Sequence, residues 1–268
     1  MSSLHFTIIQ TALFWEDKDA NLDMLAQKIR NISEPTEIIV LPEMFNTGFS
    51  MQPEKMGETI DGPTVDWMRR LSVEKKAILT GSLIIEENGK YFNRLIWMLP
   101  TGQFGFYDKR HLFAFAGEDE QYTAGNKRLI ASVKGWKINL QICYDLRFPV
   151  WARQQLNNAA ESEDNNKEYD VLLYVANWPE KRNHAWKTLL TARAIENQCF
   201  TIGVNRVGLD GNNIAHSGDS MVVGPLGEVL YHCAHNEDVF HIRLQKEEVN
   251  NTRVNFPFWK DADDFTIL

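Results

Sequence analysis

The chain has 268 residues, of which 44% are hydrophobic and 24% are charged, and its formal net charge is −8. This composition is ordinary for a globular protein, and the length allows one large domain or two small ones. The acidic balance argues against nonspecific binding to nucleic acid, which requires a basic face to neutralise phosphates.

The first part of the chain alternates short apolar runs with a helical pattern. Residues 4–10 form the first predicted strand, and Asp17 can cap the helix that follows. One face of that helix carries apolar side chains at helical spacing, namely Leu22, Leu25, Ile29 and Ile32. The β-branched run at 37–41 predicts a second strand that ends at Pro42.

A second helix and a pair of strands are predicted next. Pro63 suits the first turn of a helix, where the missing proline N–H costs nothing. The runs at 77–84 and 92–99 predict two strands, and residues 87–89 (Glu-Asn-Gly) between them form a turn sequence. A connection this short makes the two strands antiparallel, so the sheet is predicted to be mixed.

The second half of the chain continues this alternation. Further strands are predicted at 137–143, 169–176, 199–204, 220–223 and 229–233. A helix is predicted at 180–198, and the polar segment 157–168 is predicted to be an exposed loop. The whole pattern favours a single α/β domain spanning 1–268, with helix layers covering buried sheets.

The N-terminal sequence and the length of the apolar runs predict where in the cell the protein is located. The N-terminal sequence lacks the basic and apolar segments of a signal peptide, and the most apolar run, 171–178, is too short to span a bilayer. We therefore expect a soluble, cytoplasmic protein that binds neither membrane nor nucleic acid. The aromatic tail at 255–268 is expected to pack on the body of the protein or on a partner subunit.

The chain contains three cysteines, Cys143, Cys199 and Cys233. An odd number without close spacing is not a disulfide framework, and no pair has the CxxC spacing of a thiolate zinc site. Cys199 and Cys233 lie within predicted strands without a cluster of polar neighbours, so we interpret both as structural residues.

Three segments place a reactive side chain directly after an apolar run, where a rigid scaffold commonly displays functional groups. Glu43 follows Pro42, and a rigidly held carboxylate suits a general base, although a surface glutamate is the simpler interpretation. Lys109 would offer a fixed positive charge to an oxyanion, although a solvated basic turn is the simpler interpretation. The nearby His111 is interpreted as a hydrogen-bonded structural residue.

The third reactive side chain is Cys143, which ends a predicted strand shortly before a helix expected near Pro149. A helix N-terminus lowers the pKa of a thiol and supplies N–H groups for an oxyanion. The alternative is a buried structural cysteine. Arg147 is a candidate to bind a substrate carboxylate, with a structural ion pair to Asp145 as the alternative.

Together these segments resemble the nitrilase superfamily of carbon–nitrogen hydrolases along almost the whole chain. The matching landmarks are LPEMF at 41–45, GS at 81–82, YDKRHLF at 107–113, CYDLRFPVW at 143–151, NWP at 177–179, ARAIEN at 192–197 and HSGDSMVVGPLGE at 216–228. Within the superfamily, DKRHLF and CYDLRFPVW are most similar to the omega-amidase branch, which deamidates 2-oxo acid amides such as 2-oxoglutaramate.

The resemblance implies a four-layer α-β-β-α sandwich with mixed sheets, and a homodimer formed through helices that the aromatic tail would help to seal. It implies Cys143 as the nucleophile, Glu43 as the general base and Lys109 as the oxyanion stabiliser. Glu118 is our choice for the family's second glutamate, with Glu120 as the alternative. No metal and no organic cofactor is implied.

The resemblance also implies a reaction, the hydrolysis of the terminal amide of a small 2-oxo dicarboxylic acid monoamide through a cysteine thioester. The candidate substrate-binding residues lie beside the motifs and are Phe45, Tyr144, Arg147 and Trp178, of which the aromatic ones could equally be core residues. The same chemistry could serve an aliphatic amidase, a carbamoylase or a nitrilase. A silent binding protein or a redox sensor based on Cys143 is disfavoured, because neither uses Glu43 and Lys109.

Overall fold

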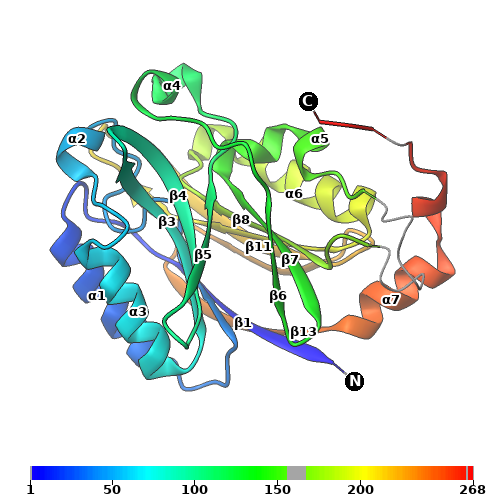
Figure 1. Cartoon of the computed structure of the whole chain (residues 1–268). Helices are drawn as coiled ribbons and strands as arrows, with labels where there is room; N and C mark the ends of the chain where they lie inside the picture. Colours follow the sequence, from blue (N-terminus) through cyan, green and yellow to red (C-terminus); the bar gives the residue numbers. More distant parts are fainter. Residues whose placement is uncertain (1, 156–166, 264, 268) are drawn as a thin grey trace.

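The computed structural model describes residues 2–155, 167–263 and 265–267, so most of the loop predicted at 157–168 lies outside the described residues. Two mixed β-sheets pack face to face, and helices cover the outer face of each sheet (Figure 1). This is the four-layer α-β-β-α arrangement that was expected.

The first sheet has the strand order β13-β1-β2-β3-β4-β5. Its strands are β1 (Ser3–Gln10), β2 (Ile38–Val40), β3 (Ile78–Glu87), β4 (Lys90–Met98), β5 (Phe104–Asp108) and β13 (Asp238–Gln245). β1, β2 and β3 are parallel, whereas β3, β4 and β5 form an antiparallel meander. Asn88 and Gly89 join β3 to β4 with φ values of 55° and 73°, the positive values that a type I′ hairpin turn requires.

The second sheet has the strand order β10-β11-β9-β8-β7-β6, and β12 pairs with β11. Its strands are β6 (Leu129–Val133), β7 (Trp136–Ile142), β8 (Val171–Ala176), β9 (Phe200–Asn205), β10 (Val207–Leu209), β11 (Ala215–Val223) and β12 (Val229–Ala234). The central strands β7, β8 and β9 are parallel. Every residue of β8 is buried, because this strand is covered on both faces.

Side chains of the first sheet alternate between two cores. In β2, Ile38 and Val40 point into the core between the sheets, whereas Ile39 belongs to the core beneath the helices α1 (Lys18–Arg30) and α3 (Pro63–Lys75). The side chain of Asp17 caps α1 by accepting a hydrogen bond from Ala20 N at 3.1 Å, as predicted. Pro63 is the first residue of α3, also as predicted.

Helix α6 (Asn183–Asn197) covers the second sheet. A single helix was predicted at 180–198, and the structure forms its first turn as the separate 3₁₀ segment η4 (Glu180–Arg182). Gly203 of β9 permits the close approach of this helix, because a Cβ atom there would lie 2.5 Å from the Leu190 side chain and 2.7 Å from Trp186. The remaining helical segments are α2 (Pro53–Met56), η1 (Ala114–Ala116), α4 (Glu118–Gln121), η2 (Cys143–Arg147), α5 (Pro149–Ala152), α7 (Lys246–Asn255) and η5 (Phe258–Asp261).

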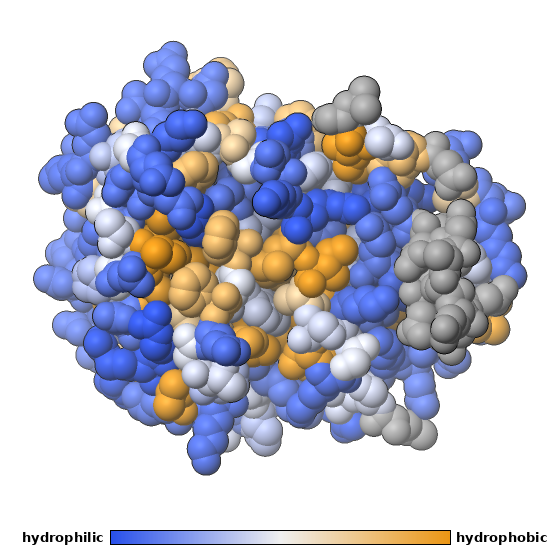
Figure 2. Space-filling view, viewed as in Figure 1, coloured by the Kyte–Doolittle hydropathy of each residue, from blue (hydrophilic) through white to orange (hydrophobic). Residues whose placement is uncertain are grey.

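The outer strands β5 and β6 bring one edge of each sheet together, and hydrophobic residues gather on the surface in the middle of this face (Figure 2). The C-terminal tail contacts the body through Phe265, whose carbonyl accepts a hydrogen bond from Gln155, and through Ile267, which packs on the core. Phe256 and Phe258 of the tail stay exposed. No helix within the described residues combines the length and apolar character needed to cross a bilayer.

Candidate active site

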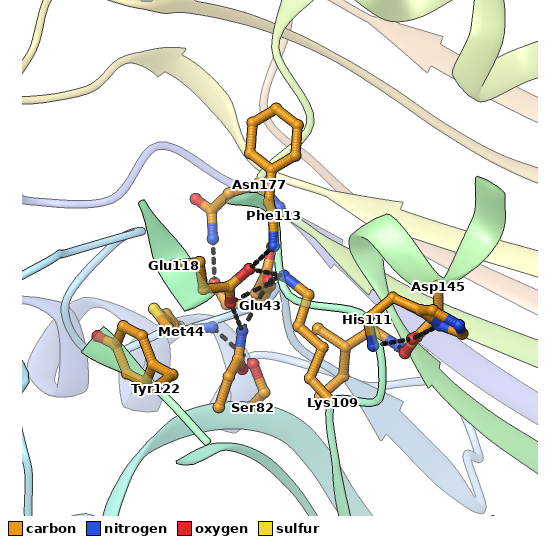
Figure 3. Close-up of polar contacts among 12 residues, drawn as sticks. Glu43, Met44, Ser82, Lys109, His111, Phe113, Glu118, Tyr122, Asp145 and Asn177 are labelled. Carbon is orange, nitrogen blue, oxygen red and sulfur yellow. Dashed lines mark hydrogen bonds and ion pairs between the residues drawn. The ribbon is translucent and has the colours of Figure 1, made fainter. Parts of the chain in front are cut away.

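The functional candidates lie in segments that directly follow strands of both sheets. Glu43 follows β2 and Lys109 follows β5 in the first sheet, whereas Cys143 follows β7 and Asn177 follows β8 in the second. Figure 3 shows that Lys109 extends between the carboxylates of Glu43 and Glu118. Of the predicted catalytic residues, these three are in direct contact, and Cys143 lines the same pocket as Lys109.

The ammonium group of Lys109 is fully buried between two carboxylates. Its Nζ lies 2.9 Å from Glu43 Oε1 and 3.0 and 2.8 Å from the two oxygens of Glu118. Burial alone would lower the pKa of Lys109, but the negative charges of Glu118 and Glu43 outweigh it and raise this pKa. Lys109 therefore remains a cation although its side chain is buried. The neighbouring Glu120 is exposed, so only Glu118 is positioned to hold Lys109.

Burial raises the pKa of Glu118, and the nearby charge of Glu43 adds to this effect while Lys109 opposes it. The Glu118 carboxylate is held in place by the N–H of Phe113, which donates to Oε2 at 2.6 Å. The fixed cation is thus shared by two rigid carboxylates.

Asn93 joins the two carboxylates, a role that the sequence did not indicate. Its side-chain amide donates to Oε1 of Glu43 at 2.8 Å and to Oε1 of Glu118 at 3.2 Å. Its backbone carbonyl also accepts a hydrogen bond from Lys109 N at 3.0 Å. One residue of β4 therefore positions all three charged groups.

Asn177 connects Glu43 to the second sheet. Its backbone N–H donates to Glu43 Oε2 at 2.7 Å, and its side-chain amide donates to the Glu43 carbonyl oxygen at 2.5 Å. Both oxygens of the Glu43 carboxylate are thus occupied by donors from different elements, which fixes the orientation of the group. This contact crosses between the sheets, and the NWP motif did not reveal it.

Cys143 is 9% exposed and begins η2 with a φ of 44°, a left-handed conformation that is strained for a non-glycine residue. Contrary to the expectation of a lowered thiol pKa, burial and the negative charge of Glu43 raise it well above its ordinary value, against the opposing charge of Lys109. Five residues of 3₁₀ helix supply too weak a dipole to offset them. The resting group is a thiol, which requires a base.

Asp145 ties the lysine-bearing segment to the cysteine-bearing segment. Its Oδ2 accepts hydrogen bonds from the Tyr107 hydroxyl at 2.7 Å and from Ile142 N at 3.0 Å. Its Oδ1 lies 3.0 Å from His111 N and 2.8 Å from His111 Nδ1. His111 is thus the hydrogen-bonded structural residue that was predicted, and the ion pair considered between Asp145 and Arg147 is absent among the described residues.

The pocket next to Cys143 contains three of the four predicted substrate-binding residues, Tyr144, Arg147 and Trp178. Phe45 lies elsewhere, because it is fully buried beneath the helices and stacks on Trp67. It is a core aromatic, the alternative interpretation of its place beside Glu43. Arg182 also lines the pocket, and the sequence did not single it out.

Known proteins with similar sequences are hydrolases of carbon–nitrogen bonds. The family model described as carbon-nitrogen hydrolase matches residues 6–254. The chain is 41% identical to the omega-amidase YafV of Escherichia coli strain K12, and the match covers 100% of both chains.

The chain belongs to the carbon–nitrogen hydrolase family.

Two further relatives support this membership. The 2-oxoglutaramate amidase of Bacillus subtilis is 29% identical over 87% of each chain. The crystal structure of XC1258 from Xanthomonas campestris, a CN-hydrolase superfamily protein with an arsenic adduct in its active site, is 40% identical with a TM-score of 0.96 over the full length of both chains. This carbon–nitrogen hydrolase therefore acts on carbon–nitrogen bonds other than peptide bonds and has the α-β-β-α fold of the nitrilase superfamily.

The other two cysteines of this hydrolase differ from Cys143. Cys199 is fully buried, and burial raises its pKa to about 12, whereas Cys233 is half-buried on β12. All three cysteines are free thiols. Among the described residues, no group of three or more His, Cys, Asp or Glu side chains could hold a metal ion.

Proposed function

We propose that this hydrolase is an amidase that removes ammonia from the terminal amide of a small 2-oxo dicarboxylic acid monoamide. The observation that carries the proposal is the pairing, in one pocket, of a cysteine and a buried lysine with the cationic side chain of Arg147. The first two suit amide hydrolysis, and the third suits a substrate that carries a carboxylate at its other end. The names of the omega-amidase relatives support the same assignment.

In the first step Glu43 accepts the proton of the Cys143 thiol, and the sulfur forms a bond to the amide carbon. The carbonyl electron pair moves to oxygen and produces a tetrahedral oxyanion. Lys109 and the backbone N–H of Tyr144 stabilise this charge, and each such donor contributes about 3 kcal/mol. The raised pKa of Cys143 makes a base necessary, and Glu43 is the adjacent carboxylate.

In the second step the oxyanion collapses and the carbon–nitrogen bond breaks. Glu43 returns its proton to the leaving nitrogen, so ammonia departs and a thioester remains on Cys143. Water then attacks the thioester carbon while Glu43 accepts a proton from it. The carbon–sulfur bond breaks, the sulfur regains the proton from Glu43, and the carboxylic acid leaves. Glu118 keeps Lys109 in position through both steps.

The substrate class is tested by measuring ammonia release from 2-oxoglutaramate and 2-oxosuccinamate beside an N-carbamoyl amino acid, an uncharged aliphatic amide and a nitrile. We expect the two 2-oxo acid amides to have the highest kcat/KM. A preference for the carbamoyl compound or the nitrile would contradict the proposed substrate class and favour a carbamoylase or nitrilase of the same family.

Replacing Glu43 by Gln separates general-base catalysis from thiol reactivity. We expect kcat for amide hydrolysis to fall by about 10²- to 10⁴-fold, the usual contribution of a positioned base. Loss of the neighbouring negative charge also lowers the pKa of Cys143, so its alkylation by iodoacetamide near neutral pH should become faster. Mass spectrometry of the alkylated peptide measures this rate.

The two readouts for Glu43→Gln thus move in opposite directions. Parallel loss of hydrolysis and alkylation would indicate a disordered pocket and would contradict the assignment of Glu43 as the base. Glu120→Gln is the matched control, because Glu120 is exposed and lies outside the pocket.

We further propose that the protein is a single domain acting as a cytoplasmic homodimer. Support comes from apolar side chains that remain exposed on α6 and around β12, namely Ile195, Leu226, Val229 and Leu230. An exposed group of apolar side chains is typical of a subunit interface. Light scattering should give twice the mass of one chain, and a monomer at micromolar concentration would contradict the dimer.

A further inference from the structure

We propose that Arg182 joins Arg147 in a two-arginine subsite that binds the carboxylate of the substrate and makes the pocket selective for anionic amides. This inference rests on the proposed amidase function and deepens it, because it assigns the specificity for charge to a residue of η4. Two guanidinium groups can bind one carboxylate through several charge-assisted hydrogen bonds.

Both arginines are held against aromatic rings of the same pocket. The Cζ atom of Arg147 lies 5.0 Å from the ring centroid of Trp178, and that of Arg182 lies 5.1 Å from the ring centroid of Phe113. The indole of Trp178 also donates a hydrogen bond to the carbonyl oxygen of Arg182 at 2.9 Å, which fixes η4 beside the ring. These contacts orient the guanidinium planes and leave their N–H groups available.

Neither guanidinium has an anionic partner in the described part of the chain. No carboxylate lies within 4.0 Å of Arg147 or Arg182, and neither side chain donates a hydrogen bond to another described residue. By contrast, Arg193 of α6 binds Glu196 and the carbonyl oxygen of Leu146. Arg193 is therefore paired, whereas the two arginines of the pocket have no carboxylate partner among the described residues.

The charges that line the pocket are unevenly distributed. Lys109 is already neutralised by Glu43 and Glu118, whereas no described carboxylate forms an ion pair with Arg147 or Arg182. Asp210 is an acidic residue of the pocket lining, and its charge acts on Arg206, while its Oδ1 accepts hydrogen bonds from the N–H groups of Asn212 and Ile214.

The burial of Arg182 and its proximity to Arg147 support this assignment. Burial lowers the pKa of Arg182, a negative charge on Cys143 would oppose this effect, and the positive charge of Arg147 makes a smaller lowering contribution. A bound carboxylate would relieve both lowering effects, since it replaces lost hydration and compensates the like charges. An uncharged substrate would leave the two cations uncompensated. The site is thus built for an anion at the end opposite the amide.

The first test compares succinamate with its methyl ester, which keeps the amide and removes the charge. In Arg182→Met, the ratio of kcat/KM for the acid to that for the ester should fall about 10- to 100-fold, as expected for loss of a charged hydrogen bond. Arg182→Lys should recover part of the ratio because it restores the charge. Lys181→Met is the matched control, since Lys181 is an exposed cation of the same segment outside the pocket.

The second test does not depend on turnover. Iodoacetate and iodoacetamide both alkylate a thiol, but only iodoacetate is an anion, so the ratio of their rates at Cys143 reports the positive charge of the pocket. Arg182→Met should lower this ratio, whereas a change in thiol pKa alone would alter both rates equally. Glutarate should also protect Cys143 in the wild type and protect it less in the variant.

The outcomes separate the two proposals. If the wild type hydrolyses neither amide while Arg182→Met lowers the alkylation ratio, the proposed function fails and the anion subsite stands. If the wild type prefers succinamate and Arg182→Met changes neither ratio, the amidase assignment stands and the role of Arg182 is overturned.

Discussion

Replacing Cys143 by Ala is expected to abolish ammonia release, with a fall in kcat of about 10⁴-fold or more, because removal of a nucleophile eliminates the covalent route. The loss should be confined to chemistry. Cys143 is small and lies at the edge of a pocket, so Ala removes one sulfur atom without opening a large cavity. Circular dichroism and urea unfolding should resemble the wild type.

Cys233→Ala is the matched control for this experiment, because Cys233 is a free thiol on β12 outside the pocket. It should retain activity and should still react with one equivalent of iodoacetamide at Cys143. Survival of amide hydrolysis in Cys143→Ala would overturn the thioester mechanism. Equal loss in both variants would point to a general requirement for thiols and would also contradict it.

Replacing Lys109 by Met should affect stability as well as catalysis. The variant leaves the buried carboxylates of Glu43 and Glu118 without the cation that lies within 3.0 Å of both. Breaking a buried ion pair from one side typically lowers the free energy of unfolding by about 3–5 kcal/mol. Amide hydrolysis should fall by about 10²-fold or more, since the oxyanion loses its fixed positive charge. Urea unfolding and ammonia release measure the two effects.

The stability loss of Lys109→Met should depend on pH. Without the lysine, nothing opposes the burial and the charge of Glu43 that raise the pKa of Glu118, so the folded state binds more protons than the unfolded state. Stability then falls as pH rises, and the deficit relative to the wild type should be larger at about pH 8 than at about pH 5.

The double variant Lys109→Met with Glu118→Gln tests the cause of that loss. It removes one of the two uncompensated charges and should recover part of the stability without recovering activity. A deficit that is independent of pH, or that the second substitution leaves unchanged, would show that lost packing rather than unpaired charge destabilises the single variant.

Several features of the site follow from local sequence. Glu43, Lys109 and Cys143 each come directly after a short apolar run, and that pattern predicts reactive groups displayed at strand ends. Glu118 was chosen from neighbouring acidic residues through the resemblance, and the structure shows it buried beside Lys109 whereas Glu120 is exposed. Their proximity depends on the order of the strands in two sheets.

The residues that position these groups carry no local signal. Asn93 lies in the middle of β4, and only the pairing of β3, β4 and β5 places its amide between two carboxylates. Asp145 could be considered only as a partner for the nearby Arg147, yet it binds the segment 107–111, about 35 residues earlier in the chain. Arg182 becomes a candidate binding residue only because the fold places it in the pocket, against the ring of Phe113.

Several strands escaped prediction for a related reason. β5, β6 and β10 are short and lie at sheet edges, so most of their side chains are only partly buried and their apolar runs span three residues or fewer. β13 has mixed polarity and is stabilised by pairing with β1, at the opposite end of the sequence. Such non-local hydrogen bonds stabilise a strand that its own composition does not predict.

The sequence by itself determined the element types over most of the chain, the family resemblance and the chemical types of the proposed catalytic residues, because periodicity, turn residues and motifs are local properties. Only the tertiary structure decided which groups touch and how they ionise. The thiol pKa shows this most clearly: proximity to a helix start suggested a lower value, but burial and Glu43 raise it. Desolvation and charge–charge interaction depend on distances in space, which are set when the two sheets pack together.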